Sequence, residues 1–247
     1  MKTRTSLAGL MVVAGFAGAV FAEDVVKMDQ VVFSEDFESY EVDQKLPTGT
    51  AWSTVSANES QNCFVHVRAD VDKLFGKNKE NKYLQVRDAS GSSSVKALAK
   101  DIAGFESKLF RISFDVVEPD AGNTGAFGFK AGIEDISKNS GTVVNGVQLS
   151  QGKARPGLTY SMDEKLHFDV YINETDDSVK YETPDGKESR LKEGMCAVWI
   201  DEKCSSKGAG MLRTLKESVA ATSIILQTFS SSTQEVLLDN IEIAVAK

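Results

Sequence analysis

Alternate positions between Leu166 and Asn173 carry side chains that could bind a small polar ligand. His167, Asp169, Tyr171 and Asn173 are separated by apolar residues, so in an extended strand they project together from one face. An aromatic ring offers an apolar platform for sugar C–H groups, while carboxylate, amide and imidazole groups hydrogen-bond hydroxyls. We therefore predict a carbohydrate-binding surface here. The alternative is a solvated outer face, which any antiparallel sheet with one wet side displays.

A second run of this kind, Phe110–Val116, would extend the surface if its strand lies in the same sheet. Arg111, Ser113 and Asp115 alternate there with four apolar residues. Trp199 is a further candidate, because a half-exposed Trp can stack on a sugar ring. The residues at alternate positions around Trp199 include both apolar and charged side chains, so its role stays open. Trp52, in contrast, is expected in the core. Together these residues predict a concave, polar binding surface.

The run Leu237–Ile243 places Asp239 at the same parity as its aliphatic residues, so we expect its carboxylate to point into the core. A buried charge needs a cation, several hydrogen bonds or a proton. Calcium takes six to eight oxygen ligands, and the opening strand could supply further carboxylates: Glu35, Asp36 and Glu38. The alternative is that Asp239 and Asn240 lie at a strand end and cap a turn through backbone hydrogen bonds.

Three cysteines, Cys63, Cys196 and Cys204, leave at least one thiol unpaired. In an oxidising compartment an odd number means one disulfide and one free thiol, or no disulfide. The segment between Cys196 and Cys204 could double back as a hairpin, and we predict that these two pair. A structural zinc site is not expected, because His66 and His167 lie far apart in the sequence.

Period-two alternation broken by Gly, Asn, Asp and Ser clusters dominates the chain from Val31 onward, which indicates half-buried strands joined by turns. Besides the two runs above, weaker alternation predicts strands at Phe64–Arg68, Tyr83–Arg87, Ala126–Ile133, Gly146–Leu149, Ser178–Glu182, Cys196–Asp201, Ser223–Phe229 and Val236–Val245. Ser94–Phe105 and Met211–Ala221 are expected to form short helices or loops. The number of strands fits two packed antiparallel sheets in a single domain, residues 23–247.

The first 22 residues have the features of a removable signal peptide. Lys2 and Arg4 precede an uncharged run from Leu7 to Ala22, which ends in small residues before Glu23. This run is shorter than the roughly 20 residues that a membrane-spanning helix needs. We therefore expect an exported protein without stable membrane insertion, located outside the cell, in a periplasm or on the cell surface.

The charge balance excludes one class of partner. Lys and Arg total 28 and Asp and Glu total 36; removing 1–22 takes away two basic residues and no acidic one, so the net charge falls from −8 to −10. Nucleic-acid binding relies on clustered Lys and Arg at phosphates. We therefore expect no nucleic-acid partner.

Stretches at both ends of the mature chain resemble strands of secreted concanavalin A-like or laminin-G-like (LamG-like) jelly rolls. The opening stretch is Phe33–Tyr40, followed by Leu46–Gly49 and Trp52; the closing stretch is Leu237–Ile243. Two further runs are similar to core strands of the same domains and of jelly-roll carbohydrate-binding modules: Tyr83–Val86 and Ile112–Val116. The resemblance implies an all-β, two-sheet antiparallel jelly-roll sandwich. Its relatives often bind glycans, sometimes cleave them, and often hold a structural calcium ion near the paired terminal strands.

The same comparison favours binding over catalysis. Retaining glycosidases need two carboxylates about 5 Å apart, and relatives with this activity carry them at alternate positions of one strand; the Glu35–Glu38 run has the wrong spacing. Lyase chemistry would need a Tyr/His pair drawn from Tyr160 or Tyr171 with His66 or His167. We predict no catalytic residue and a secreted, lectin-like carbohydrate-binding or surface-associated protein. A structural envelope or matrix adhesion protein and a polysaccharide hydrolase or lyase stay as alternatives.

Overall fold

The computed structural model describes residues 24–247 except positions 77, 79, 92–93, 134–135, 137–141, 156, 210–214, 216–217 and 230–232. Most described residues lie in strands or in the turns that join them, and a single 3₁₀ turn, η1 (Glu59–Gln61), is the helical segment of this part of the chain. No helix among these residues is long and apolar enough to span a membrane. The predicted leader 1–22 and most of Met211–Ala221 lie outside the described residues.

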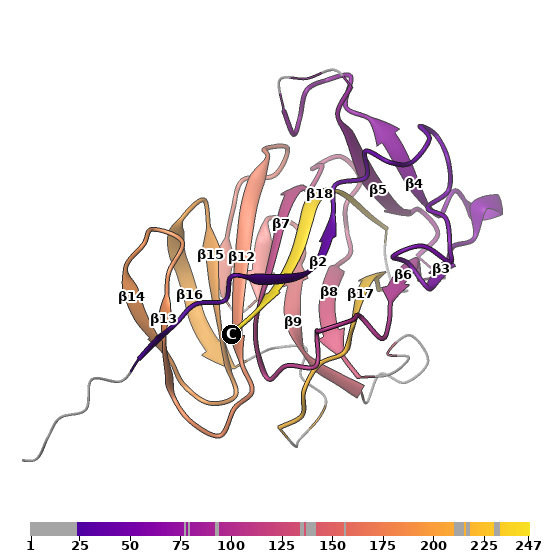
Figure 1. The fold of residues 1–247 in the computed structure, drawn as a ribbon. Coiled ribbons are helices and arrows are strands. Elements are labelled where there is room, and N and C mark those ends of the chain that lie inside the picture. The colour runs from indigo at the N-terminus through magenta and orange to yellow at the C-terminus, as the bar shows by residue number, and fades with distance from the viewer. Residues whose placement is uncertain are drawn as a thin grey trace, which may run out of the picture.

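Two antiparallel sheets form a sandwich, as predicted (Figure 1). The large sheet has the order β16-β15-β12-β7-β18-β5-β4, with β2 paired to the end of β18; the second sheet has the order β11-β10-β9-β8-β17-β6-β3. The strands of the large sheet are β16 (Lys203–Ala209), β15 (Met195–Ile200), β12 (Leu166–Asn173), β7 (Leu109–Val117), β18 (Gln234–Val245), β5 (Lys82–Asp88), β4 (Phe64–Ala69) and β2 (Gln30–Glu35). Those of the second sheet are β11 (Leu158–Thr159), β10 (Lys153–Arg155), β9 (Val143–Leu149), β8 (Phe127–Gly132), β17 (Ser223–Thr228), β6 (Lys96–Ala99) and β3 (Thr54–Ser56).

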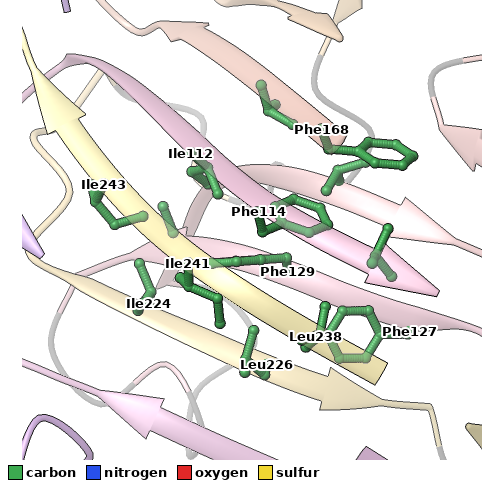
Figure 2. Packing of buried hydrophobic residues seen from close by; sticks show 14 of the residues in the cluster. Ile112, Phe114, Phe127, Phe129, Phe168, Ile224, Leu226, Leu238, Ile241 and Ile243 are labelled. Carbon is green, nitrogen blue, oxygen red and sulfur yellow. The ribbon is translucent and has the colours of Figure 1, made fainter. Parts of the chain in front are cut away.

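The core between the sheets comes from alternate positions of the central strands (Figure 2). The ring of Phe114 on β7 lies 5.3 Å from that of Phe168 on β12 and 5.1 Å from that of Phe129 on β8. Burial of each such side chain stabilises the fold by about 1.5–3 kcal/mol. Trp52 is fully buried here, as predicted. Since these residues point inward, the intervening residues of β7 and β12 occupy the outer face of the large sheet, the face turned away from the second sheet.

A third, small sheet covers part of that outer face, and this feature was not predicted. It consists of β1 (Val25–Val26), β13 (Val179–Glu182) and β14 (Glu188–Leu191), with β1 parallel to β13. Figure 1 shows β13 and β14 at one end of the molecule, beside β15 and β16. Between the small and large sheets lies an apolar group, called here the small-sheet cluster: Met28, Leu109, Tyr171, Tyr181, Leu191, Ala197 and Trp199. Both faces of β15 are therefore buried over much of its length.

Two other segments differ from the sequence-based expectation. Residues Lys96–Ala99 form strand β6, where a short helix or a loop was expected. Strand β2 ends at Glu35 rather than continuing to Tyr40, because Phe37 has a left-handed φ of 60° and the chain leaves the sheet. The predicted pairing of the terminal strands is confirmed, since Glu35 lies opposite Ile241.

A bulge in β18 inverts the predicted orientation of Asp239. The pairing between β18 and β7 shifts register between Asp239 and Glu242, and Asn240 has a φ of 50°. Leu238 points into the core before the bulge and Ile241 does so after it. Asp239 consequently lies on the outer face of the large sheet, opposite Asp115, and not on the core side. The prediction assumed unbroken alternation, which an extra residue in a strand abolishes.

The cysteines are free in this structure, so the predicted Cys196–Cys204 disulfide is corrected. The predicted hairpin does form, from β15 and β16, but it places the two side chains on opposite faces. Cys196 points into the core, whereas Cys204 pairs with Trp199, whose side chain is on the outer face. A disulfide needs the two Cβ atoms about 4 Å apart and facing each other.

We expect one cysteine to react with a water-soluble maleimide in the native protein and three to react after denaturation. Cys204 is exposed, while Cys63 and Cys196 are buried. Burial also raises the pKa of Cys196 to about 12, which suppresses the reactive thiolate. Intact-mass measurement without reductant would count the adducts, and Cys204→Ser should abolish native labelling. A single adduct after denaturation would mean that two cysteines are paired.

The bulge can be tested with two substitutions of Asn240. Asn240→Gly permits the left-handed φ and removes only the side-chain hydrogen bond to Asp115. Asn240→Val removes the same bond and also forces a β-branched residue into that conformation, at a cost of about 1–3 kcal/mol. In urea unfolding we expect the valine variant to be less stable than the glycine variant by that amount. Equal losses would argue against a left-handed residue at this position.

Candidate functional site

The open part of the outer face carries a group of polar side chains, called here the polar strip. It lies where β12 pairs with β7, and β7 with β18. His167 is opposite Asp115, and Asp169 is opposite Ser113. The predicted extension of the surface from Leu166–Asn173 to Phe110–Val116 is therefore confirmed as a shared face of one sheet. The polar strip consists of Arg111, Ser113, Asp115, His167, Asp169, Asn240 and Glu242.

Two apolar clusters limit the polar strip along β7. Leu109 belongs to the small-sheet cluster at one end, and Val117 packs with Phe75 and Leu237 at the other. Between them lie Arg111, Ser113 and Asp115. At 3.3 Å per residue, the four steps from Arg111 to Asp115 span about 13 Å. The strip is thus a short polar area with apolar cover on two sides.

His167 lies at the centre of the strip. Its Nδ1 is 2.7 Å from the Asp115 carboxylate, and its Nε2 is 3.2 Å from the Ser113 hydroxyl and 3.5 Å from Asp169. Hydrogen bonds to Asp115 and Asp169 raise its pKa to about 10, against the lowering effect of burial. The imidazole is therefore doubly protonated at neutral pH and donates from both nitrogens. Its side chain is still 40% exposed, so a ligand can reach it.

Asp115 is almost fully buried and is surrounded by donors. Its carboxylate accepts hydrogen bonds from His167, from Lys165 Nζ at 2.8 Å and from Asn240 Nδ2 at 2.9 Å. Burial acts to raise the pKa of Asp115, but these three hydrogen bonds outweigh it and lower the pKa below its ordinary value. Asp115 thus stays ionised and holds His167 and Asn240 in place.

Arg111 lies between carboxylates of the two strands that flank β7. Its guanidinium bonds to the Glu242 carboxylate, and its Nε is 3.7 Å from Asp169. Burial acts to lower the pKa of Arg111, but the charge of Asp169, the Tyr171 phenol and the charge of Glu242 together raise it. The positive charge of Arg111 is therefore already compensated within the protein.

The four predicted calcium ligands do not share one site. Both oxygens of Glu35 accept hydrogen bonds, from Phe37 N at 3.1 Å, Tyr40 Oη at 2.7 Å and Trp52 Nε1 at 3.3 Å. Asp36 and Glu38 each accept a backbone N–H, from residues 38 and 82. Among the described residues, no three His, Cys, Asp or Glu side chains are grouped as metal ligands. This donor set does not fit a calcium ion.

Asp239, the fourth predicted ligand, is instead paired with neutral donors. Its carboxylate accepts hydrogen bonds from Asn81 Nδ2 at 3.1 Å and from Asn240 N at 2.8 Å. Burial raises its pKa to about 6, and the charges of Asp115 and Glu38 add to the effect. Amide and backbone N–H groups thus satisfy the Asp239 carboxylate, as in the predicted alternative to a calcium site. Asp239 lies within a bulged strand, however, and not at a strand end.

Three predicted binding residues lie on the expected face but under other parts of the chain. The ring of Tyr171 is 4.6 Å from that of Tyr181, and Trp199 Nε1 donates to the Tyr181 hydroxyl at 3.2 Å. Both belong to the small-sheet cluster and are at most 7% exposed. Asn173 is fully buried and donates to the carbonyls of Asp177 and Leu191. Trp199 and Asn173 offer no free surface to a sugar ring, and Tyr171 reaches the surface only as part of the wall of a pocket.

Sequence reasoning missed three residues of this region. Lys165 precedes the β12 alternation. Asn240 and Glu242 lie on β18, and nothing in the sequence places that strand beside β7. One signal was present for the bulge. The Asp-Asn pair at 239–240 includes a residue type that tolerates left-handed φ, which is enriched at such irregularities.

A pocket of about 230 Å³ lies at the Arg111 end of the polar strip. The chain contributes to it from three places: the segment after β1, the outer face of the large sheet, and the turn between β13 and β14. Its lining residues are Lys27, Met28, Asp29, Arg111, Tyr171, Glu182, Thr183 and Pro184.

No protein-family model matches this chain, and no curated protein is similar to it in sequence. Solved structures are similar in fold. A sialidase superposes with a TM-score of 0.53 at 13% identity, over 87% of this chain and 19% of its own. An endo-β-1,4-glucuronan lyase from the fungus Trichoderma reesei gives 0.52 at 9% identity, over 86% and 94%. A carbohydrate esterase from the Shiga toxin-encoding bacteriophage phi24B gives 0.50 at 13% identity, over 88% and 99%.

The fold is a concanavalin-like jelly roll. The resemblance of the terminal strands to such domains is thereby confirmed at the level of architecture. This jelly roll spans only about a fifth of the sialidase chain but nearly the whole of the other two. At these identities the likeness extends to the fold and not to the activity.

The two histidines of the chain should titrate on opposite sides of 6.5, their ordinary pKa. Burial, with the charge of Arg68, lowers the pKa of His66, whereas Asp115 and Asp169 raise that of His167 to about 10. We expect two ring Hε1 resonances in NMR spectra, one titrating below pH 6.5 and one far above it. His66→Gln assigns them, and Asp115→Asn should bring the higher pKa down. Two midpoints near 6.5 would contradict the proposed contacts.

The same shift predicts a pH dependence of stability. A histidine whose folded-state pKa is raised contributes fully below its unfolded pKa of about 6.5 and loses that contribution as the pH rises toward 10. The difference in unfolding free energy between the native protein and His167→Gln should therefore shrink across this range.

Proposed function

We propose that this protein is exported and binds neutral glycans through the polar strip, without cleaving them. The observation that carries the proposal is the arrangement around His167. Charged donors, Arg111 and the His167 imidazolium, lie beside the acceptor Glu242, whose side chain is 32% exposed, on adjacent strands of one sheet. Neighbouring sugar hydroxyls need such fixed donor and acceptor pairs. The fold shared with three carbohydrate-active proteins supports a glycan-related role.

The charge of the strip favours neutral over anionic glycans. Each cation of the strip is already paired, Arg111 with Glu242 and His167 with Asp115 and Asp169. The neighbouring Lys165 pairs with Asp115 as well. The carboxylates of an anionic polysaccharide would therefore lie near the buried carboxylates of the strip, and no unpaired cation of the strip would be there to bind them. The net charge of the whole chain, −8, adds long-range repulsion.

Several features argue against catalysis at this site. Tyr171 is buried, and its pKa is raised to about 12, so it is not available as the base of a lyase. Tyr160 packs against the sandwich core and bonds to Glu118, away from the outer face. His167 has no free lone pair at neutral pH, because two carboxylates hold it protonated.

A second candidate function, acyl-ester hydrolysis, is favoured by one observation. Ser113 Oγ, His167 and Asp115 are connected in the order of a nucleophile, base and acid triad, at 3.2 Å and 2.7 Å. In such a reaction Ser113 would attack the acyl carbon and His167 would accept its proton and pass it to the alcohol that leaves as the ester C–O bond breaks. Water would then release the acyl group from Ser113. The first step requires a neutral imidazole, which the Asp169 carboxylate opposes. Ester hydrolysis of p-nitrophenyl acetate that is lost in Ser113→Ala would overturn the non-catalytic proposal.

Glycan binding can be tested with an array of neutral and anionic polysaccharides, followed by titration calorimetry. We expect neutral glycans to bind and alginate and polyglucuronate not to bind. Glu242→Gln keeps the side-chain shape but removes an accessible charged acceptor, which is worth about 1.5–3 kcal/mol, so affinity should fall ten-fold or more. Glu106→Gln, an exposed carboxylate in the connection before β7, is the matched control and should bind normally. Absence of binding to any glycan would refute the proposal.

A further inference from the structure

One wall of the pocket beside Arg111, the segment after β1, contacts other parts of the molecule. Lys27 Nζ bonds to Glu182 at 2.6 Å, and Asp29 pairs with Lys247 at 3.4 Å. Met28, between them, is buried in the small-sheet cluster. The segment after β1 is thereby held against both the small sheet and the C-terminal end of β18. Burial of Met28 is the main contact that fixes this wall of the pocket, because the two ion pairs are exposed to solvent and contribute little.

The small sheet ends the open part of the outer face at this pocket. Tyr171 on β12 pairs with Arg111 on one side and with Ala197 on β15 on the other. Tyr171 and Ala197 lie beneath the small sheet. A glycan chain that follows the polar strip toward β15 therefore meets the turn between β13 and β14. It cannot continue over the large sheet without displacing a packed apolar cluster.

We propose that this pocket holds the terminal ring of a neutral glycan, and that the polar strip holds the ring or rings that follow. The protein would then recognise chain ends rather than chain interiors. This inference rests on the proposed glycan-binding function. It adds that the protein binds the end of a glycan and that this end lies in the pocket.

The size and chemistry of the pocket fit one uncharged ring. Its volume of about 230 Å³ is below the roughly 300–1,000 Å³ of pockets for larger ligands. Its two cations, Lys27 and Arg111, are balanced by two carboxylates, Asp29 and Glu182. These groups offer both donors and acceptors to ring hydroxyls, while Met28 and Pro184 supply apolar contacts. A uronic acid would place a third carboxylate among them.

Binding stoichiometry as a function of chain length separates end recognition from interior recognition. The probes are cello-, laminari-, manno- and xylo-oligosaccharides from the disaccharide to the hexasaccharide, together with the matching polysaccharides, in titration calorimetry. We expect one protein per chain at every length, with affinity that stops rising once the strip is filled. A number of bound proteins that grows with chain length would overturn end recognition while leaving glycan binding intact.

Exposed pocket residues supply the matched variants. The side chains of Glu182 and Asp29 are 42% and 53% exposed, so Glu182→Gln and Asp29→Asn should fold normally, which thermal melting would verify. Each removes one charged acceptor, and we expect at least one of them to weaken binding about ten-fold. Glu188→Gln, exposed on β14 outside the pocket, is the control. Wild-type affinity in both pocket variants, with loss only in Glu242→Gln, would overturn the pocket assignment. No binding of any glycan would refute the function itself.

Discussion

The central constraint on this structure is the burial of three carboxylates on one face of a β-sheet. Asp115, Asp169 and Asp239 are each at most 5% exposed, and Asp115 lies directly opposite Asp239 in the sheet. Removing an ionised carboxylate from water costs several kcal/mol unless charges and hydrogen bonds compensate for it. The neighbouring side chains supply that compensation unevenly. Asp115 receives two cationic donors and an amide and stays ionised, whereas Asp239 receives only neutral donors and has a pKa of about 6.

This compensation also determines the rigidity of the polar strip. His167 is held by carboxylates at both nitrogens, and Arg111 by Glu242 on one side and Asp169 on the other. Side chains fixed in this way lose little further conformational freedom when a ligand binds, so more of the interaction energy appears as affinity. The same fixation removes the uncommitted charges that an anionic ligand would need. Rigidity and preference for an uncharged ligand therefore have a common origin in the buried carboxylates.

Alternation in the sequence was sufficient to predict the sandwich, most of its strands, and the shared outer face of β7 and β12. It failed where a second layer or an irregularity intervened. Tyr171 and Trp199 have the parity of outer-face residues, but a local pattern contains no information about the small sheet that covers them, since that sheet is formed by β1 and by β13 and β14. Asp239 was placed on the wrong face because the bulge at Asn240 gives the residues before it the opposite parity to Ile241 and Ile243. The first error concerned long-range packing and the second a local irregularity of the backbone, while the prediction of a strand was correct in both places.

Geometry alone would assign a different role to the same atoms. The distances between Ser113, His167 and Asp115 match those of a catalytic triad. The difference is made by Asp169, which lies opposite Ser113 and within 3.5 Å of the His167 Nε2 that would have to accept a proton. Asp115 and this additional carboxylate together raise the pKa of His167 to about 10, so a potential base becomes a cation that donates from both nitrogens. What this face of the jelly roll can do therefore follows from the protonation state of His167, and that state depends on which residues the register between β7 and β12 places side by side.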